Sequence, residues 1–171
     1  MGDLGVAHLA SCVIVAGRPV VVTDGLSTIH PLLVHFPIAL LVTAAVADTA
    51  SLVFRCHSRL RQLSNGLYIA GAAMLIATYF TGRSAAMIVR VPGMAHAVID
   101  AHWTSALWTT VYVCTVAAGR LASIVLEKTW HPYLTRALVF ASILGLALVL
   151  QTAEHGGRLV YEFGVGVAAP K

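Results

Sequence analysis

Four long apolar segments constrain this chain more than any other feature of its sequence. They cover residues 32–54, 67–89, 101–126 and 134–153. A helix needs about 20 apolar residues to cross a hydrocarbon core about 30 Å thick, and each segment reaches that length. Inside lipid every backbone N–H and C=O must be paired within the protein, which a helix achieves by itself. The sequence therefore predicts an all-α integral membrane protein, an up-down four-helix bundle spanning residues 28–171.

The composition supports this class of protein and argues against others. The chain of 171 residues is 58% hydrophobic and 11% charged, whereas soluble domains are about 45–50% apolar and about 25% charged. Its charge of +4 is not gathered into a basic, aromatic-rich patch, so nucleic acid is not an expected partner. The three cysteines form neither CxxC nor CxxCH, which argues against a redox dithiol and covalently attached haem. No nucleophile elbow or HExxH motif indicates a hydrolase or transferase.

Residues 1–27 are expected to form a short N-terminal arm outside the bundle. The apolar stretch LGVAHLASCVIVAG is too short to span a bilayer. The stretch RPVVVTDG, from Arg18 to Gly25, is typical of a short extended piece followed by a turn. LASC, ending at Cys12, resembles a lipoprotein cleavage box, although Asp3 rather than a basic residue precedes it. We expect this arm at the membrane surface or on a partner subunit.

The distribution of basic residues predicts an orientation in the membrane. Arg55, Arg59 and Arg61 follow the first segment, and Lys128 lies between the third and the fourth. Because short cytoplasmic loops are enriched in Lys and Arg, this end is expected to face the cytoplasm. Both termini would then lie on the periplasmic side of a bacterial inner membrane.

Two prolines shape the start of the first segment. Pro31 suits the first turn of a helix, because its missing N–H would be unpaired there, and Thr28 is a candidate cap before it. Pro37 is expected to kink or loosen the helix beside His35.

Five of the eight histidines are predicted to lie at the outer end of the bundle. They are His30 and His35 on the first segment, His96 and His102 at the third, and His155 on the fourth. Ionisable groups within membranes are rare and tend to mark functional sites, and imidazole is a preferred ligand of haem iron and transition metals. One histidine at a helix end is more often an interfacial residue or a cap. Three helix ends at one depth predict a shared ligand.

The leading hypothesis for this ligand is b-type haem, one or two per chain, held by histidines from facing helices. The expected axial pair is His35 with His102, and His155 and His30 are the substitutes.

Other residues are assigned supporting roles around the haem. Gly82 and neighbouring small residues would make room for the macrocycle, although small residues also serve close helix packing in membranes. Arg83, Arg90 and Arg158 are candidate partners of the propionates. Trp108 is expected either to anchor the helix at the interface or to pack on the macrocycle.

Two alternatives stay open. Three histidines with Glu154 or Asp100 could hold zinc or copper in a compact metal-binding or transport site. The histidine pairs are five and six residues apart, so neither shares one helix face, which favours ligands from different helices. The second alternative is a cofactor-free accessory subunit of a membrane complex.

Asp48 lies within the first segment, where a buried carboxylate needs a partner. Arg120 lies at a matching depth in the third segment. The sequence predicts a structural ion pair between them.

The two ends of the chain resemble a known family. HPLLVHFPIALL, from His30, and HGGRLVYEFGVGV, from His155, resemble motifs of the bacterial domain-of-unknown-function family 2231, predicted four-helix membrane proteins. The resemblance covers His30 to Val167, and the middle of the chain matches less well. Relatives fused to Rieske or cytochrome-type domains imply an electron-transfer setting. The motif histidines correspond to His30, His35 and His155, with His102 as the third-helix counterpart.

Together these features predict a haem-binding membrane electron-transfer protein, a carrier rather than a catalyst. It is expected to contact membrane lipids and other subunits of a respiratory or photosynthetic complex. A quinone or a c-type cytochrome is the expected redox partner.

Overall fold

The computed structural model describes residues 12–15, 18–21, 25–54, 57–89, 91–125 and 132–166. Two N-terminal strands, β1 (Cys12–Val15) and β2 (Arg18–Val21), pair antiparallel. The helices that follow are α1 (Gly25–Leu33), α2 (His35–Val53), α3 (His57–Ile88), the 3-10 turn η1 (Gly93–Ala95), α4 (His96–Val125) and α5 (Pro132–Tyr161). The predicted all-helical membrane domain is confirmed.

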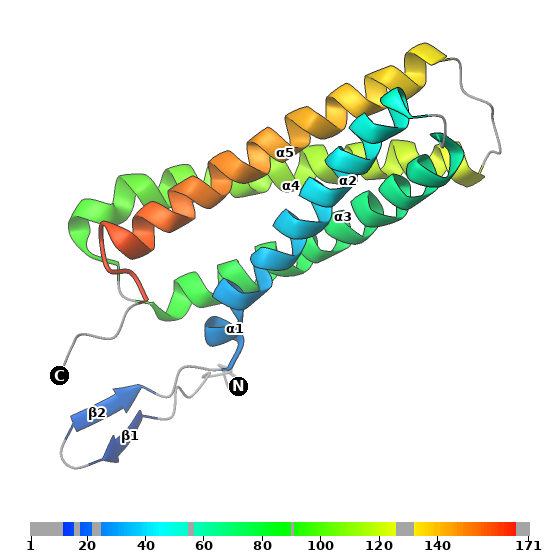
Figure 1. Cartoon of the computed structure of the whole chain (residues 1–171). Helices are drawn as coiled ribbons and strands as arrows, with labels where there is room; N and C mark the ends of the chain where they lie inside the picture. Colours follow the sequence, from blue (N-terminus) through cyan, green and yellow to red (C-terminus); the bar gives the residue numbers. More distant parts are fainter. Residues whose placement is uncertain are drawn as a thin grey trace, which may run out of the picture.

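The long helices form an up-down bundle (Figure 1). Four helical spans are long and apolar enough to cross a membrane: Ile29–Val53, Ser58–Met87, Gly93–Val125 and Tyr133–Tyr161. α2 packs on α3 and α5, and α4 packs on the same two helices. α1, the start of α4 and the end of α5 lie together at one end, which we call the α1 end. The ends of α2 and α4 and the starts of α3 and α5 lie at the opposite end.

The helices extend further than the apolar segments predicted. α3 begins at His57 rather than near residue 67, and α5 continues to Tyr161 rather than ending near 153. Hydropathy locates only the part of a helix that crosses the hydrocarbon, whereas polar turns at either end keep the same backbone geometry. These added turns matter because they carry polar side chains into the bundle.

Two prolines divide the first span. The expectation that Thr28 caps a helix starting at Pro31 is wrong, because α1 begins at Gly25 and Pro31 lies near its end. A proline inside a helix lacks a backbone donor and crowds the carbonyl four residues earlier. Pro37 makes that carbonyl the one of Leu33, where α1 ends, and the chain turns at Val34 before α2 begins. The loosened helix expected beside His35 is therefore present.

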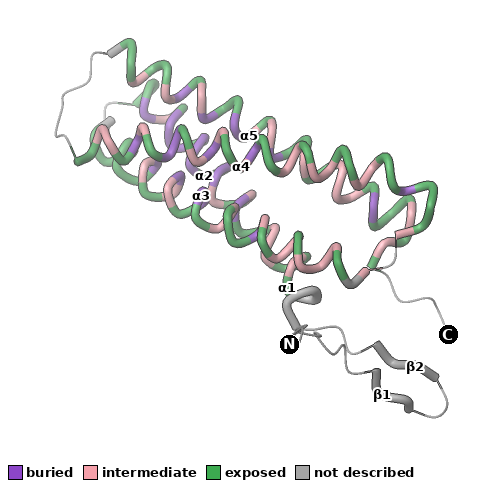
Figure 2. Tube along the Cα trace, turned by 180° about the vertical axis from the view of Figure 1, so that it is seen from behind, coloured by how far each residue is buried: buried purple, intermediate pink, exposed green. Residues whose placement is uncertain are grey.

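The buried residues lie where the helices face one another, and exposed residues cover the outside (Figure 2). Leu41, Tyr68 and Val113 are almost fully buried in the core. Large apolar side chains such as Phe80 and Phe140 point outward. In a membrane protein that outward apolar surface meets lipid tails, which explains why so many large apolar residues stay outside the core.

The predicted ion pair is confirmed. Asp48 on α2 binds Arg120 on α4, and both side chains are at most 2% exposed. Arg120 also donates to Ser64 at 3.1 Å and to Asn65 at 2.9 Å on α3. Its guanidinium lies 4.7 Å from the centre of the Tyr68 ring. This network links the helices at the opposite end of the bundle.

Candidate functional site

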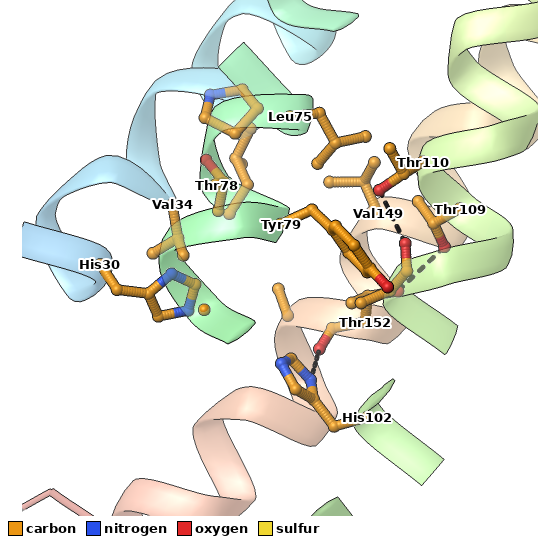
Figure 3. A pocket seen from close by; sticks show the side chains of 15 residues that line it. His30, Val34, Leu75, Thr78, Tyr79, His102, Thr109, Thr110, Val149 and Thr152 are labelled. Atoms are coloured by element: carbon orange, nitrogen blue, oxygen red, sulfur yellow. Dashed lines mark hydrogen bonds between the residues drawn. The ribbon is translucent and has the colours of Figure 1, made fainter. Parts of the chain in front are cut away.

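A cavity of about 80 Å³ lies between the helices at the α1 end, and two histidines face it (Figure 3). His30 enters from α1 and His102 from α4. We call it the histidine cavity. The rest of the lining comes from α2, α3, α4, α5 and the residue between α1 and α2: Val34, Pro37, Ile38, Leu75, Thr78, Tyr79, Gly82, Ala106, Thr109, Thr110, Val149, Thr152 and Ala153. The walls are mostly apolar, so the two imidazoles are its strongest polar groups.

The first imidazole is held by α3. Nδ1 of His30 lies 3.1 Å from the hydroxyl oxygen of Thr81. That hydroxyl donates its own hydrogen to the Thr78 carbonyl at 3.0 Å, so its oxygen accepts from His30. In the neutral imidazole only one ring nitrogen carries a hydrogen. With the Thr81 hydroxyl hydrogen on the Thr78 carbonyl, the ring hydrogen of His30 lies on Nδ1, and Nε2 has a free lone pair.

The second imidazole is held in the same way by α5. Nδ1 of His102 lies 3.1 Å from the Thr152 carbonyl oxygen, which can only accept. Nε2 of His102 is then the unprotonated nitrogen of the neutral ring. Metal-binding histidines commonly donate the other N–H to a carbonyl or hydroxyl, which sets the ring orientation. Both histidines thus have the hydrogen-bonding arrangement of a ligand whose Nε2 remains available.

A glycine lies against each imidazole. A Cβ added to Gly82 would lie 2.7 Å from Cε1 of His30 and 3.2 Å from its Nε2. A Cβ added to Gly156 would lie 3.2 Å from Cε1 of His102. Any larger residue would displace the rings, because contacts this short force the neighbour to move. Gly82 was expected to make room for a macrocycle, and in the structure it makes room for the imidazole of His30.

Hydroxyl groups continue from His102 along the α4–α5 contact. The Thr152 hydroxyl lies 2.7 Å from that of Ser105 and 3.0 Å from that of Thr109. It donates to the Leu148 carbonyl at 2.9 Å. These bonds tie α4 to α5 directly beside the imidazole, so they stiffen the wall that carries His102.

His35, the expected partner of His102, does not line the histidine cavity. It is exposed as the first residue of α2, whereas His30 is half-buried. Residues five apart point about 140° away from each other on a helix of 3.6 residues per turn. One member of the pair therefore turns inward only if the other turns outward, and the structure places His30 inside. His96 is also exposed.

His155 and Trp108 belong to a different surface. They line an open groove between α4 and α5, together with Asp100. Nδ1 of His155 is buried and has no hydrogen-bond partner among the described residues. Trp108 is 65% exposed, as an interfacial or lipid-facing side chain would be. Neither residue faces His30 or His102 across the histidine cavity.

Two of the three predicted propionate partners lie within the described residues, and both are exposed. Arg83 is exposed on α3, and Arg90 lies outside the described residues. Arg158 is exposed and forms an ion pair at 3.0 Å with Glu162, which follows the end of α5. Within the described parts of the chain, no three His, Cys, Asp or Glu side chains gather in a group that could hold a metal ion.

The chain matches a family described as a predicted membrane protein, DUF2231, over residues 26–169. It belongs to this family. The resemblance carried by the two end motifs is thereby confirmed. Comparison with curated proteins gave no match, and neither did comparison with solved structures.

The family motifs contain more of the site than the sequence analysis assigned. Gly156 follows His155 in the second motif, and it lies against the imidazole of His102. Thr81 and Thr152, which orient the imidazoles, were not singled out. Thr81 precedes Gly82 directly, so a hydroxyl beside a helical glycine was the available signal. The pairing of each histidine with its hydroxyl or carbonyl depends on contacts between helices, which the sequence did not indicate.

Proposed function

We propose that this protein is an electron carrier of the bacterial inner membrane in which His30 and His102 would hold a b-type haem. One observation carries the proposal. Two imidazoles from different helices face one cavity, each with its Nδ1–H bound to the protein and with no bond to its Nε2 from the described residues. Haem iron takes imidazole nitrogen as an axial ligand, so this donor set suits it.

Haem iron would supply reversible one-electron transfer. The residues of the chain orient the two imidazoles. Thr81 and the Thr152 carbonyl keep the Nε2 atoms directed toward the cavity. Hydrogen bonds to the Nδ1–H also increase the basicity of a ligating imidazole. The apolar walls exclude water, which is one of the means by which a protein sets a redox potential.

The size of the cavity adds a requirement. Its volume of about 80 Å³ is small beside pockets for drug-sized ligands, which occupy about 300–1,000 Å³. A macrocycle therefore enters only if one wall moves outward. α1 is the wall best suited to move, because Pro37 removes a backbone hydrogen bond where α1 meets α2 and α1 packs mainly on α3.

The proposal includes a setting in the cell. Both termini would lie on the periplasmic side, so the histidine cavity would be near that surface. The chain would act as a subunit of a respiratory or photosynthetic complex, with a quinone or a c-type cytochrome as its redox partner. The basic residues of the loops and the implied electron-transfer setting of the family support this arrangement.

A reduced-minus-oxidised visible spectrum of the purified protein tests the proposal. We expect a sharp α-band from six-coordinate haem, lost in His30→Ala and in His102→Ala. His35→Ala and His96→Ala are matched controls, because both side chains are exposed outside the cavity. They should keep the band. A protein that stays colourless after expression with sufficient haem would refute the haem proposal and favour a cofactor-free accessory subunit.

The small cavity favours a second candidate, a quinol-binding site. Two neutral imidazole nitrogens can accept the two O–H hydrogens of a quinol ring, and the apolar walls suit its carbon frame. The ring is smaller than a macrocycle and needs less movement of α1. A colourless protein that releases quinone on solvent extraction, with the quinone lost in His30→Ala and His102→Ala, would support this candidate over haem.

A further inference from the structure

A second cavity lies at the opposite end of the bundle from the histidine cavity. It has a volume of about 130 Å³, and we call it the polar cavity. Its lining residues come from α2, α3, α4 and α5: Asp48, Arg61, Asn65, Arg120, Ser123, Ile124, Thr135, Leu138 and Val139. It contains the buried ion pair but also a second arginine, which the ion pair does not explain.

Both oxygens of the carboxylate in this cavity already accept hydrogen bonds. Asp48 Oδ1 accepts from Ser64 at 2.6 Å and from Arg120 at 3.4 Å. Its Oδ2 accepts from the second terminal nitrogen of Arg120. Asp48 therefore neutralises Arg120 and has little capacity left for another cation.

The donors in the cavity are not fully used. Nε of Arg120 is buried and has no acceptor among the described residues, although the side chain is only 2% exposed. Asn65 accepts from Arg120 through Oδ1, which leaves its NH2 group to donate. Arg61 gives one N–H to Thr135 at 3.1 Å, and its planar guanidinium carries five N–H groups in total. Among the described residues that line the cavity, donors therefore outnumber acceptors.

The charges lead to the same conclusion. Asp48 and Arg120 cancel, so Arg61 leaves the lining with one net positive charge. The buried Nε of Arg120 costs free energy while it has no acceptor, and an anion with several acceptor oxygens would satisfy it together with the exposed guanidinium of Arg61. Guanidinium groups bind phosphate in a two-pronged geometry. Arg61 and Thr135 lie near the starts of α3 and α5, at the same end of the bundle.

We propose that the polar cavity binds a phosphate group, either free inorganic phosphate or the headgroup of an anionic phospholipid. Arg61 supplies the unpaired positive charge, and Asn65 and Arg120 supply further donors. This inference is independent of the proposed electron carrier, because the site lies at the other end of the bundle and shares no residue with the histidine cavity.

Two measurements on the full chain in mild detergent test the proposal. The first is thermal unfolding against inorganic phosphate, with chloride at equal ionic strength for comparison. The second is native mass spectrometry of the protein as purified, which detects retained phospholipid. We expect phosphate to stabilise the protein saturably where chloride does not, or a phospholipid to stay bound.

Matched variants connect the effect to the cavity. Arg61→Gln removes the charge with little change in length, and Asn65→Asp replaces a donor with a carboxylate. Each should weaken phosphate binding about tenfold or more, the value of one hydrogen bond to a charged group, or remove the lipid. Arg59→Gln is the control, because Arg59 is exposed on the same helix and does not line the cavity.

The outcomes separate the two sources of the phosphate. Saturable stabilisation by phosphate without retained lipid supports a free anion, and retained lipid that Arg61→Gln releases supports a headgroup. The proposal is overturned if the wild type shows neither effect, if chloride stabilises as well as phosphate, or if Arg59→Gln and Arg61→Gln behave alike.

Discussion

Gly82→Ala tests the geometry of the histidine cavity most directly. The new Cβ would lie 2.7 Å from Cε1 of His30, while ordinary contact begins at 3.4 Å. The imidazole must therefore retreat by about 0.7 Å, the difference between these two distances. Its 3.1 Å hydrogen bond to Thr81 would then exceed the usual N–H···O range of about 2.7–3.2 Å. The substitution should release His30 from the orientation that directs Nε2 into the cavity.

Two opposing free energies determine the effect on stability. Alanine is better than glycine inside a helix by about 1 kcal/mol, whereas forcing an atom into a packed contact costs about 1–3 kcal/mol. Gly66→Ala on the same helix isolates the first effect, because nothing lies within 4 Å of its added Cβ. We expect Gly82→Ala to have a free energy of unfolding about 1–3 kcal/mol below that of Gly66→Ala.

The assay combines unfolding in mixed micelles with ligand binding. Loss of the group that orients a metal-binding histidine costs about 10–100-fold in affinity, so the affinity of Gly82→Ala for haem should fall by that factor, and its bound haem or quinone should decrease. Gly66→Ala should bind as the wild type does. Equal stability and equal ligand content in the two variants would refute the assignment of His30 to this position.

Three further outcomes follow from the same contacts. Asp48→Ala should lower the free energy of unfolding by about 3–5 kcal/mol, because it leaves a buried guanidinium unpaired. In a double-mutant cycle, Asp48→Ala combined with Arg120→Met should lower it by less than the sum of the two single changes. Thr81→Val should lower ligand affinity about 10–100-fold while the helical circular dichroism spectrum stays unchanged, and wild-type affinity would contradict its role in orienting the imidazole. Gly145→Ala should destabilise the fold by about 1–3 kcal/mol, since its Cβ would lie 2.8 Å from the Tyr68 hydroxyl oxygen, and Tyr68→Phe should restore most of that loss in a chemical unfolding experiment.

The sequence predicted the architecture well because the physical rule behind it is local. Each apolar segment is long enough to cross a bilayer, and lipid leaves a single chain segment few options besides a helix. The Asp48–Arg120 pair could also be predicted, because a buried charge without a partner is strongly destabilising and the two opposite charges lie at one depth. The other members of that network, Ser64, Asn65 and Ser142, are small polar residues, and small polar residues occur at many helix contacts for ordinary packing reasons.

The sequence did not predict which of His30 and His35 lines the histidine cavity. Their spacing implies that only one of them points inward, but hydropathy does not give the rotation of a helix about its axis. The turn at Val34, and the packing of α1 on α3, decide that His30 is the one inside. In the same way, His155 shares its membrane depth with His102 yet faces a separate groove.

The sequence by itself determined that this chain folds as four membrane-spanning helices with histidines gathered at one end. Only the tertiary structure decided which imidazoles share a cavity, which hydroxyl and carbonyl hold them, and that Gly82 and Gly156 leave the space for their rings. The physical reason is that burial in lipid acts on each helix separately, through its composition. The site depends on the rotation and close approach of several helices, which contacts between distant residues determine.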